Sequence, residues 1–142
     1  MSARSSFAHV TPFRVRYAEI DAQGIVFNAH YLTYYDVTIT EYLRALDFDY
    51  DGMVANTGLD FHLVKATVEY RQPIVKDAQI DVGIRCARIG TSSVTWALAI
   101  FMKDADEILS TGEIVWVCAK VGTHRSHPVP DALRRALSVD QR

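Results

Sequence analysis

The order of hydrophobic patterns constrains the fold of this chain more than any other feature of its sequence. A strand-like alternation at residues 13–17 precedes a helical apolar pattern at residues 29–46, and four strand-like stretches follow between residues 64 and 121. Short polar turns at residues 89–92 and 103–106 separate the later stretches. Because short links join antiparallel neighbours, we expect the four stretches to pair in chain order. One helix against such a sheet is an α+β arrangement.

The predicted helix is apolar on more than one side. Its main apolar residues recur at steps of three and four, which places them on one helical face. They are Leu32, Tyr35, Ile39, Tyr42, Leu43 and Leu46. Tyr31, Tyr34 and Val37 extend the apolar surface, so we expect burial on several sides. The β-branched run at residues 37–40 lowers helix propensity by a few tenths of a kcal/mol per residue, so tertiary packing must override it.

The remaining elements follow from alternation and turn residues. We expect strands at residues 64–71, 80–87, 94–102 and 108–121, and a polar connection at residues 47–60 with one short helical turn. A short helix is expected at residues 132–137, with Asp131 as its N-cap. Cys86 and Cys118 lie in apolar strand stretches and are expected to be buried free thiols.

Length and composition indicate a single domain over residues 1–142, with residues 1–9 as a frayed end. A chain of 142 residues fits one ordinary core. The net charge of -2 argues against a nucleic-acid binder. No apolar run approaches the ~20 residues of a membrane span, and no leader pattern is present, so we expect a cytoplasmic protein. One helix cannot cover both faces and both edges of a sheet, which favours self-association.

Asp21 is the first candidate catalytic residue. It follows the first strand and precedes the helix by a few residues, with Gly24 between them to allow a turn. The backbone N–H groups at a helix start can polarise a carbonyl and stabilise an oxyanion. A carboxylate beside such groups suits a hydrolase that needs neither metal nor a Ser–His pair. By residue type alone, an Asp before a Gly is more often a turn or cap residue.

The segment from Asp21 to Tyr31, followed by an aromatic-rich helix, resembles the signature of the 4-hydroxybenzoyl-CoA thioesterase family. It is similar to the branch with an Asp-x-x-Gly-x-Val loop. Later landmarks agree in order: Tyr70-Arg71-Gln72-Pro73 with Lys76-Asp77, then residues 88–93, then Pro128-Val129-Pro130. The resemblance covers about residues 10 to 138.

This resemblance implies a hotdog fold, in which a curved antiparallel sheet of about five strands wraps a long central helix. It implies acyl-CoA thioesterase activity at the interface of a homodimer, often within a homotetramer. Asp21 becomes the nucleophile or general base, and the backbone N–H of Asn28 polarises the thioester carbonyl. Gly24 and Tyr31 are expected to bind substrate.

Further candidate residues lie outside the segment from Asp21 to Tyr31. Arg88 and Ser92 are expected to bind coenzyme A, which enters as part of the substrate; no other cofactor is expected. Asp36 on the helix is the alternative catalytic acid. His124 and His127 stand three residues apart, but no further ligand has metal-site spacing, so no metal is expected.

Two other functions stay open at this point. A hotdog hydratase or dehydratase acting on 3-hydroxyacyl thioesters pairs a catalytic His with a carboxylate, and Asp21 with His30 leaves that opening. A hotdog protein that binds acyl-CoA without hydrolysing it is the rival from another class. The acyl group, the choice between coenzyme A and acyl carrier protein, and the role of Asp21 are left open by the residues.

Overall fold

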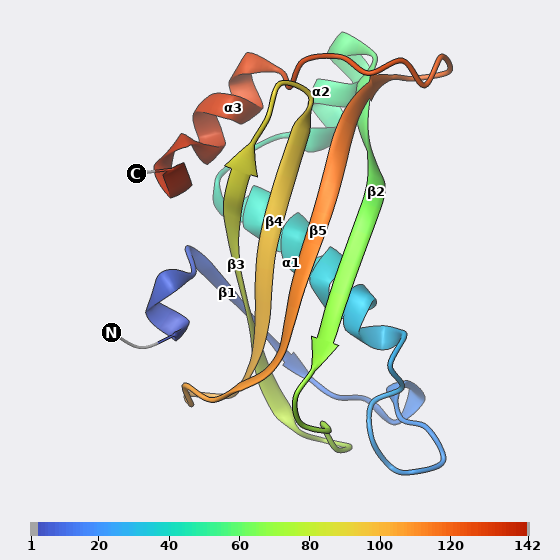
Figure 1. Cartoon of the computed structure of the whole chain (residues 1–142), viewed down its shortest axis with the longest axis vertical. Coiled ribbons are helices and arrows are strands. Elements are labelled where there is room, and N and C mark those ends of the chain that lie inside the picture. Colours follow the sequence, from blue (N-terminus) through green and yellow to red (C-terminus); the bar gives the residue numbers. More distant parts are fainter. Residues whose placement is uncertain (1–2, 142) are drawn as a thin grey trace.

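The computed structural model describes residues 3–141, in which one long helix packs across a five-stranded antiparallel sheet (Figure 1). The long helix is α1 (His30–Ala45). The strands are β1 (His9–Arg14), β2 (Leu59–Tyr70), β3 (Gln79–Ile89), β4 (Ser93–Met102) and β5 (Ile108–Lys120). The expected α+β class, with the helix-and-sheet arrangement of a hotdog fold, is confirmed.

The strand order corrects one expectation. The sheet runs β1-β3-β4-β5-β2, so β2 pairs with β5 and is not a neighbour of β3. The turns at residues 90–92 and 103–107 do form the expected hairpins β3–β4 and β4–β5. The link between β2 and β3 covers residues 71–78 and contains Pro73, which is too long for a tight hairpin. It therefore carries the chain past β5 and β4 to β3, near the opposite edge of the sheet.

The core lies between α1 and the inner face of the sheet. Tyr34, Tyr35, Thr38 and Ile39 of α1 are buried. The hydroxyl of Thr38 donates to the carbonyl of Tyr34 at 2.8 Å, so this polar group is satisfied inside the helix. The strands contribute alternate side chains to the same core: Ile80, Val82, Ile84, Cys86, Val94, Trp96, Leu98, Ile100 and Ile114. Tertiary packing thus overrides the weak helix propensity, as expected.

One side of α1 stays exposed, and Val37, which was expected to extend the buried surface, lies on it. Val37 is 40% exposed, and Thr33, Asp36, Thr40 and Arg44 are also exposed. These five positions recur at three- and four-residue steps and form one stripe. The sheet covers only the opposite side of the helix.

Two further helices differ from the expectation in extent. Residues 47–60, expected to be mainly a connection, contain α2 (Tyr50–Thr57), which Asp49 caps by accepting from the N–H of Gly52 at 3.0 Å. The terminal helix is α3 (Asp131–Leu137), so Asp131 lies in its first turn and Pro130 is the N-cap. A one-turn 3-10 helix (Ser138–Gln141) follows it.

Residues 3–9 are not frayed, which corrects that part of the expectation for residues 1–9; residues 1–2 lie outside the described residues. A short 3-10 helix (Arg4–Ser6) folds over the outer face of the sheet. Arg4 forms an ion pair with Asp81 at 2.9 Å and lies 4.8 Å from the ring centre of Phe101. The ring of Phe7 packs edge-on against Phe101 at 5.9 Å. The sequence did not indicate these contacts, because the segment is polar and the side chain of a single arginine, Arg4, makes most of them.

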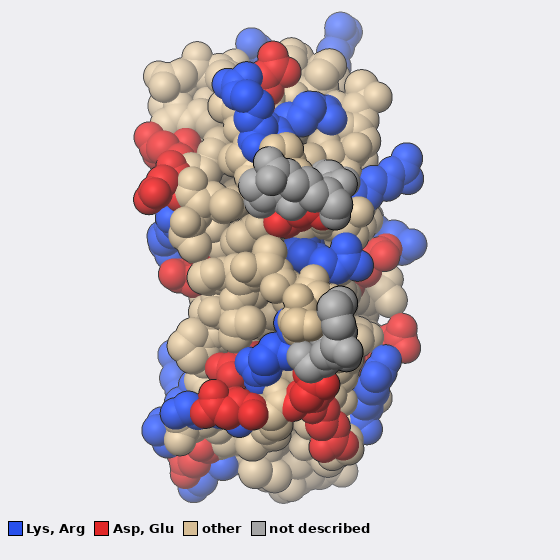
Figure 2. Space-filling view, turned by 90° about the vertical axis from the view of Figure 1, so that its left-hand side faces the viewer, with Lys and Arg blue, Asp and Glu red and all other residues tan. Residues whose placement is uncertain are grey.

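The surface carries charges of both signs. On the side shown in Figure 2, acidic and basic side chains are interspersed, and the described residues form no continuous basic surface on that side. Within residues 3–141, no helix has the length and apolar character to cross a membrane.

Candidate active site

The loop that carries Asp21 is a tight turn between two short extended segments. Ile20 and Val26 form an antiparallel bridge, the N–H of Gly24 donates to the carbonyl of Asp21 at 2.9 Å, and the N–H of Asp21 donates to Ile25 at 2.8 Å. Gly24 has φ +76°. That backbone conformation is open to glycine at little cost, which explains its place three residues after Asp21.

The Asp21 carboxylate has one oxygen engaged and one free for other contacts. Its Oδ1 accepts from the N–H of Gln23 at 2.8 Å, which is the local bond expected of a turn aspartate. Within residues 3–141, Oδ2 makes no hydrogen bond. The turn role and a chemical role are therefore compatible, because the first uses a single oxygen and fixes the orientation of the second.

The buried residue Glu19 anchors the loop that carries Asp21. Glu19 accepts from the backbone N–H of Arg16 at 2.8 Å and from the hydroxyl of Tyr34 at 2.8 Å, and its carbonyl accepts from the N–H of Phe27 at 2.9 Å. Burial is the largest influence on the Glu19 carboxyl and opposes ionisation. The hydrogen bonds from Arg16 and Tyr34 and the charge of Arg16 outweigh it and lower the pKa of Glu19 below its usual value. Glu19 thus ties the strand, the loop and α1 together.

The start of α1 presents unpaired backbone donors. The N–H of His30 donates to Phe27 at 2.9 Å, and the N–H of Tyr31 donates to Asn28 at 3.3 Å. Among the described residues, the N–H groups of Asn28 and Ala29 have no hydrogen-bond partner. Both lie at the positive end of the α1 dipole.

Asp21 and Asn28 line one depression of about 410 Å³ at the lower end of the sheet in Figure 1. Its other lining residues are Gln23, Ile25, Val26, Tyr31, Tyr70, Arg71, Gln72 and Pro73. The rings of Tyr31 and Tyr70 meet edge-to-face, with their centres 4.7 Å apart. Burial, and secondarily the neighbouring Tyr70, raises the pKa of Tyr31, so its hydroxyl stays protonated at neutral pH.

Comparison with known proteins places this fold and loop in one family. The pattern of the thioesterase-like superfamily matches residues 15–137, which include Asp21, Gly24 and the whole of α1. The chain belongs to the thioesterase-like superfamily. The expectation of a thioester hydrolase is confirmed at the level of this enzyme class, and the finer 4-hydroxybenzoyl-CoA branch goes beyond what the match covers.

Individual members of the thioesterase-like superfamily agree with this assignment. A putative esterase of Aquifex aeolicus is 32% identical over 91 residues, covering 64% of this chain and 70% of that protein. The acyl-CoA thioester hydrolase YbgC of Escherichia coli O6:H1 is 29% identical over 107 residues, which cover 75% of this chain and 78% of that protein. The crystal structure of the PA5185 protein of Pseudomonas aeruginosa superposes with a TM-score of 0.84 at 28% identity. The superposition covers 96% of this chain and 93% of that protein.

The residues expected to bind substrate are divided between separate places. Gly24 shapes the Asp21 turn, and Tyr31 lies in the same depression. Arg88 lies instead in a shallow depression of about 520 Å³ beside the β3–β4 turn, at the opposite end of the sheet (Figure 1). Ser92 lies in that turn, where its carbonyl accepts from the N–H of Cys118 at 2.7 Å. A single chain does not bring Arg88 and Ser92 to Asp21, whereas Arg71 shares the Asp21 depression.

The other candidate catalytic and metal-binding residues named from the sequence make only local contacts. Asp36 belongs to the exposed stripe of α1, away from the Asp21 depression. The ring of His30 lies 6.0 Å from that of Phe27. His124 has its ring 5.5 Å from His62, and residues 3–141 contain no cluster of three or more metal-ligating side chains.

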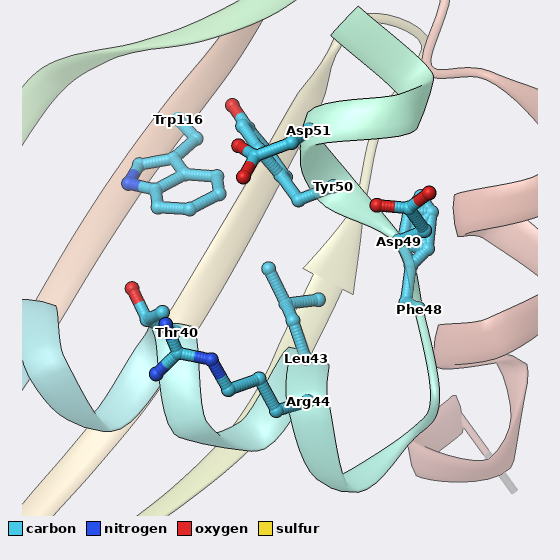
Figure 3. Close-up of a pocket in the computed structure, with 8 residues that line it drawn as sticks. All are labelled: Thr40, Leu43, Arg44, Phe48, Asp49, Tyr50, Asp51 and Trp116. Carbon is cyan, nitrogen blue, oxygen red and sulfur yellow. The ribbon is translucent and has the colours of Figure 1, made fainter.

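A second cavity of about 440 Å³ was not foreseen from the sequence. It lies at the other end of α1, between α1, α2 and β5 (Figure 3). Its lining residues are Thr40, Leu43, Arg44, Phe48, Asp49, Tyr50, Asp51 and Trp116. Phe61 packs beside it, 5.6 Å from Trp116 and 6.4 Å from Tyr50 between ring centres. The signal available was the aromatic pair Phe48 and Tyr50 within a segment interpreted as a connection.

Proposed function

We propose that this protein is an acyl-CoA thioesterase whose catalytic carboxylate is Asp21. The observation that carries the proposal is the shared depression: Asp21, with one carboxylate oxygen free, lines the same hollow as Asn28, whose backbone N–H has no partner among the described residues. The named activity of the Escherichia coli relative, acyl-CoA thioester hydrolysis, agrees with it.

The carbonyl oxygen of the thioester would accept a hydrogen bond from the N–H of Asn28. This donor and the α1 dipole stabilise the negative charge that develops when the carbonyl is attacked. No side-chain cation is needed for that step. The adjacent N–H of Ala29 is a second donor at the same helix start.

Asp21 then acts by one of two routes. As nucleophile, its Oδ2 attacks the carbonyl carbon, the C–S bond breaks with release of the coenzyme A thiolate, and water hydrolyses the mixed anhydride. As general base, it accepts a proton from the attacking water, the C–S bond breaks, and the thiolate takes up the proton. Single turnover in H₂¹⁸O distinguishes them, because only the nucleophilic route can place ¹⁸O in Asp21.

Arg71 is the cation that we expect to meet coenzyme A phosphates first, because it lines the Asp21 depression. A guanidinium binds phosphate through paired N–H donors. Arg88 and Ser92 stay predicted contacts, which require the substrate to reach the other end of the sheet. Arg71→Ala is expected to raise KM for acyl-CoA more than Arg88→Ala does.

The enzyme is proposed to act as a homodimer, joined through β2. This strand pairs only with β5 among the described residues and leaves a full backbone edge open. Leu63, Val64 and Tyr70 of β2 are 48%, 58% and 52% exposed, which is an unusual density of apolar groups for an edge strand. A second copy would cover both the edge and the exposed stripe of α1. Light scattering on the purified protein measures the mass and separates monomer, dimer and tetramer.

Thiol release from a panel of acyl-CoA esters tests the function. Asp21→Asn is expected to lower kcat by about two to four orders of magnitude while leaving the fold intact. Asp104→Asn, the same exchange in the exposed β4–β5 turn, is the matched control. Hydrolysis by Asp21→Asn at the wild-type rate would remove Asp21 from the mechanism. Binding of acyl-CoA without thiol release by the wild type would favour a non-hydrolytic binder, and hydration of an enoyl thioester would favour a hydratase.

A further inference from the structure

The hydroxyl of Tyr31 makes no hydrogen bond within residues 3–141, although the residue is only 3% exposed. The other buried tyrosines of α1 all have partners: Tyr34 donates to Glu19 at 2.8 Å, Tyr35 pairs with Ser110 at 2.6 Å, and Tyr42 donates to Asp140 at 2.7 Å. Buried hydroxyls are nearly always hydrogen-bonded, because an unpaired one costs free energy. The exception at Tyr31 therefore points to a group that binds there.

This hydroxyl is open to the Asp21 depression, which Tyr31 lines. Among the described residues, the unpaired polar side-chain atoms that are sealed from solvent are Oγ1 of Thr11 and Nε1 of Trp96. The Tyr31 hydroxyl is not one of them. Tyr31 is the second residue of α1, and long helical side chains point toward the start of their helix. The phenol thus lies on the same side as the free N–H of Asn28.

The other polar side chains of the depression are satisfied without a ligand. The hydroxyl of Tyr70 donates to the carbonyl of Asn28, and the side-chain amide of Gln72 bonds to a carboxylate in the β4–β5 link. The side chains of Gln23 and Asn28 are exposed, so water meets their amide groups. Tyr31 is therefore the donor of this depression that gains most from a bound acceptor.

The position of Tyr31 relative to a bound thioester follows from its contacts. In the proposed mode of binding, the carbonyl oxygen lies at the N–H of Asn28 and the coenzyme A arm leads toward Arg71. The ring of Tyr31 meets that of Tyr70 at 4.7 Å between centres, and Tyr70 directly precedes Arg71 in the chain. Tyr31 thus lies on the coenzyme A side of the carbonyl. The atom that joins the carbonyl carbon to that arm is the sulfur.

We propose that the hydroxyl of Tyr31 donates a hydrogen bond to the thioester sulfur as the C–S bond breaks. This proposal rests on the function proposed above. In that step the bonding pair passes to the sulfur, which becomes a thiolate, and the carbonyl double bond re-forms. A hydrogen bond to a charged acceptor is stronger than one to a neutral acceptor, so the transition state gains more than the bound ester does.

The phenol keeps its own proton throughout. Burial raises the pKa of Tyr31, so the hydroxyl acts as a hydrogen-bond donor and not as an acid. The thiolate takes up its proton after the C–S bond has broken. Tyr31 is in this sense a catalytic residue that touches the leaving atom, beside the carboxylate of Asp21 and the N–H of Asn28.

Tyr31→Phe tests the role of the hydroxyl, because it keeps the ring and its contact with Tyr70. We expect kcat for acyl-CoA to fall about 10- to 100-fold with less than about a threefold change in KM. The Tm should not fall, since the lost hydroxyl has no partner in the free protein. Tyr35→Phe, one turn along α1, should instead lower the Tm by losing Ser110 and keep kcat within about twofold. Tyr17→Phe, an exposed tyrosine outside the depression, is the matched control for both measurements.

A change of leaving group tests the assignment to the sulfur. The same acyl group is offered as its N-acetylcysteamine thioester and as its thiophenyl ester, neither of which carries a nucleotide. An aryl thiol is a stronger acid than an alkyl thiol, so its thiolate departs readily without a donor. The loss of kcat/KM in Tyr31→Phe should be about tenfold or more for the alkyl thioester and less than about threefold for the aryl ester.

If the wild type accepts neither small ester, bound coenzyme A gives the same comparison. The ultraviolet absorbance of its thiolate reports the pKa of the bound thiol. That pKa should be higher in Tyr31→Phe than in the wild type, because the donor to the thiolate is missing. Equal values in the two proteins would overturn the proposal.

The remaining outcomes also decide the question. An unchanged kcat in Tyr31→Phe, or an equal loss with both leaving groups, overturns the proposal while the proposed function stands. A Tm that falls as far as in Tyr35→Phe shows a structural hydroxyl and overturns it as well. Absence of thiol release from every acyl-CoA with the wild type overturns the proposed function and this proposal together.

Discussion

The hydroxyl of Tyr70 donates a hydrogen bond of 3.1 Å to the backbone carbonyl of Asn28. This bond joins the end of β2 to the start of α1, 42 residues earlier in the chain. It fixes the peptide between Asn28 and Ala29 while the N–H groups of both residues stay unpaired. The backbone carbonyl of Glu19 accepts from the N–H of Phe27 and so holds the Val26–Phe27 peptide, one residue before the candidate donors. The candidate oxyanion donors are therefore oriented from both sides before any substrate binds.

Tyr70→Phe should impair turnover more than binding. The ring and its contact with Tyr31 are kept, and only the bond to the Asn28 carbonyl is lost. Because a neutral hydrogen bond contributes about 1 kcal/mol, kcat is expected to fall about three- to tenfold with little change in KM. Steady-state kinetics measure both constants. An unchanged kcat would mean that this bond does not orient the donors.

Glu19→Gln should reduce stability at neutral pH by about 1–3 kcal/mol, because charged hydrogen bonds to Arg16 are weakened. The pKa of Glu19 is lowered in the folded protein, so its ionised form adds stability above the unfolded-state pKa. That stability is lost as the pH falls through the folded-state pKa. Chemical denaturation at pH 7 and at pH 3 should therefore show a smaller difference between variant and wild type at the lower pH. A difference that grows in acid would contradict this account.

Gly112→Ala should destabilise the protein by about 1–3 kcal/mol through overpacking. A Cβ atom at residue 112 would lie 2.5 Å from Cε2 of Tyr35. That ring is fully buried, and its hydroxyl bonds to Ser110 at 2.6 Å, so it has no room to move. Thermal unfolding measures the loss. In a Tyr35→Leu background the same Gly112→Ala exchange should cost less, since the clashing ring is absent.

The two cysteines should be unreactive in the folded protein. Both are buried, and burial raises the pKa of Cys86 to about 12, so almost no thiolate is present at pH 8. Burial also raises the pKa of Cys118. Ellman's reagent should label neither thiol in native buffer and both in denaturant. Rapid labelling of the native protein would show that the sheet opens at these positions.

Local pattern located the long strands, α1 and the candidate catalyst, but it missed α2. Period-two alternation located the long strands, and the spacing of Tyr35, Ile39 and Tyr42 located α1, because side-chain periodicity depends only on neighbouring residues. The Asp21–Gly24 turn was equally visible, since a glycine with positive φ is a local requirement. Resemblance of the same segment to a thioesterase family then indicated the chemistry.

Only the tertiary structure decided what these elements face. It placed β2 beside β5 at an open edge, brought Tyr70 to the carbonyl of Asn28, and separated Arg88 from Asp21. It also formed a cavity between Leu43, Tyr50 and Trp116, for which the only signal in the sequence was the aromatic residues of a segment interpreted as a connection. Such contacts join residues tens of positions apart. Their free energy comes from burial and pairing that exist only once the chain has closed on itself, so sequence spacing alone does not specify them.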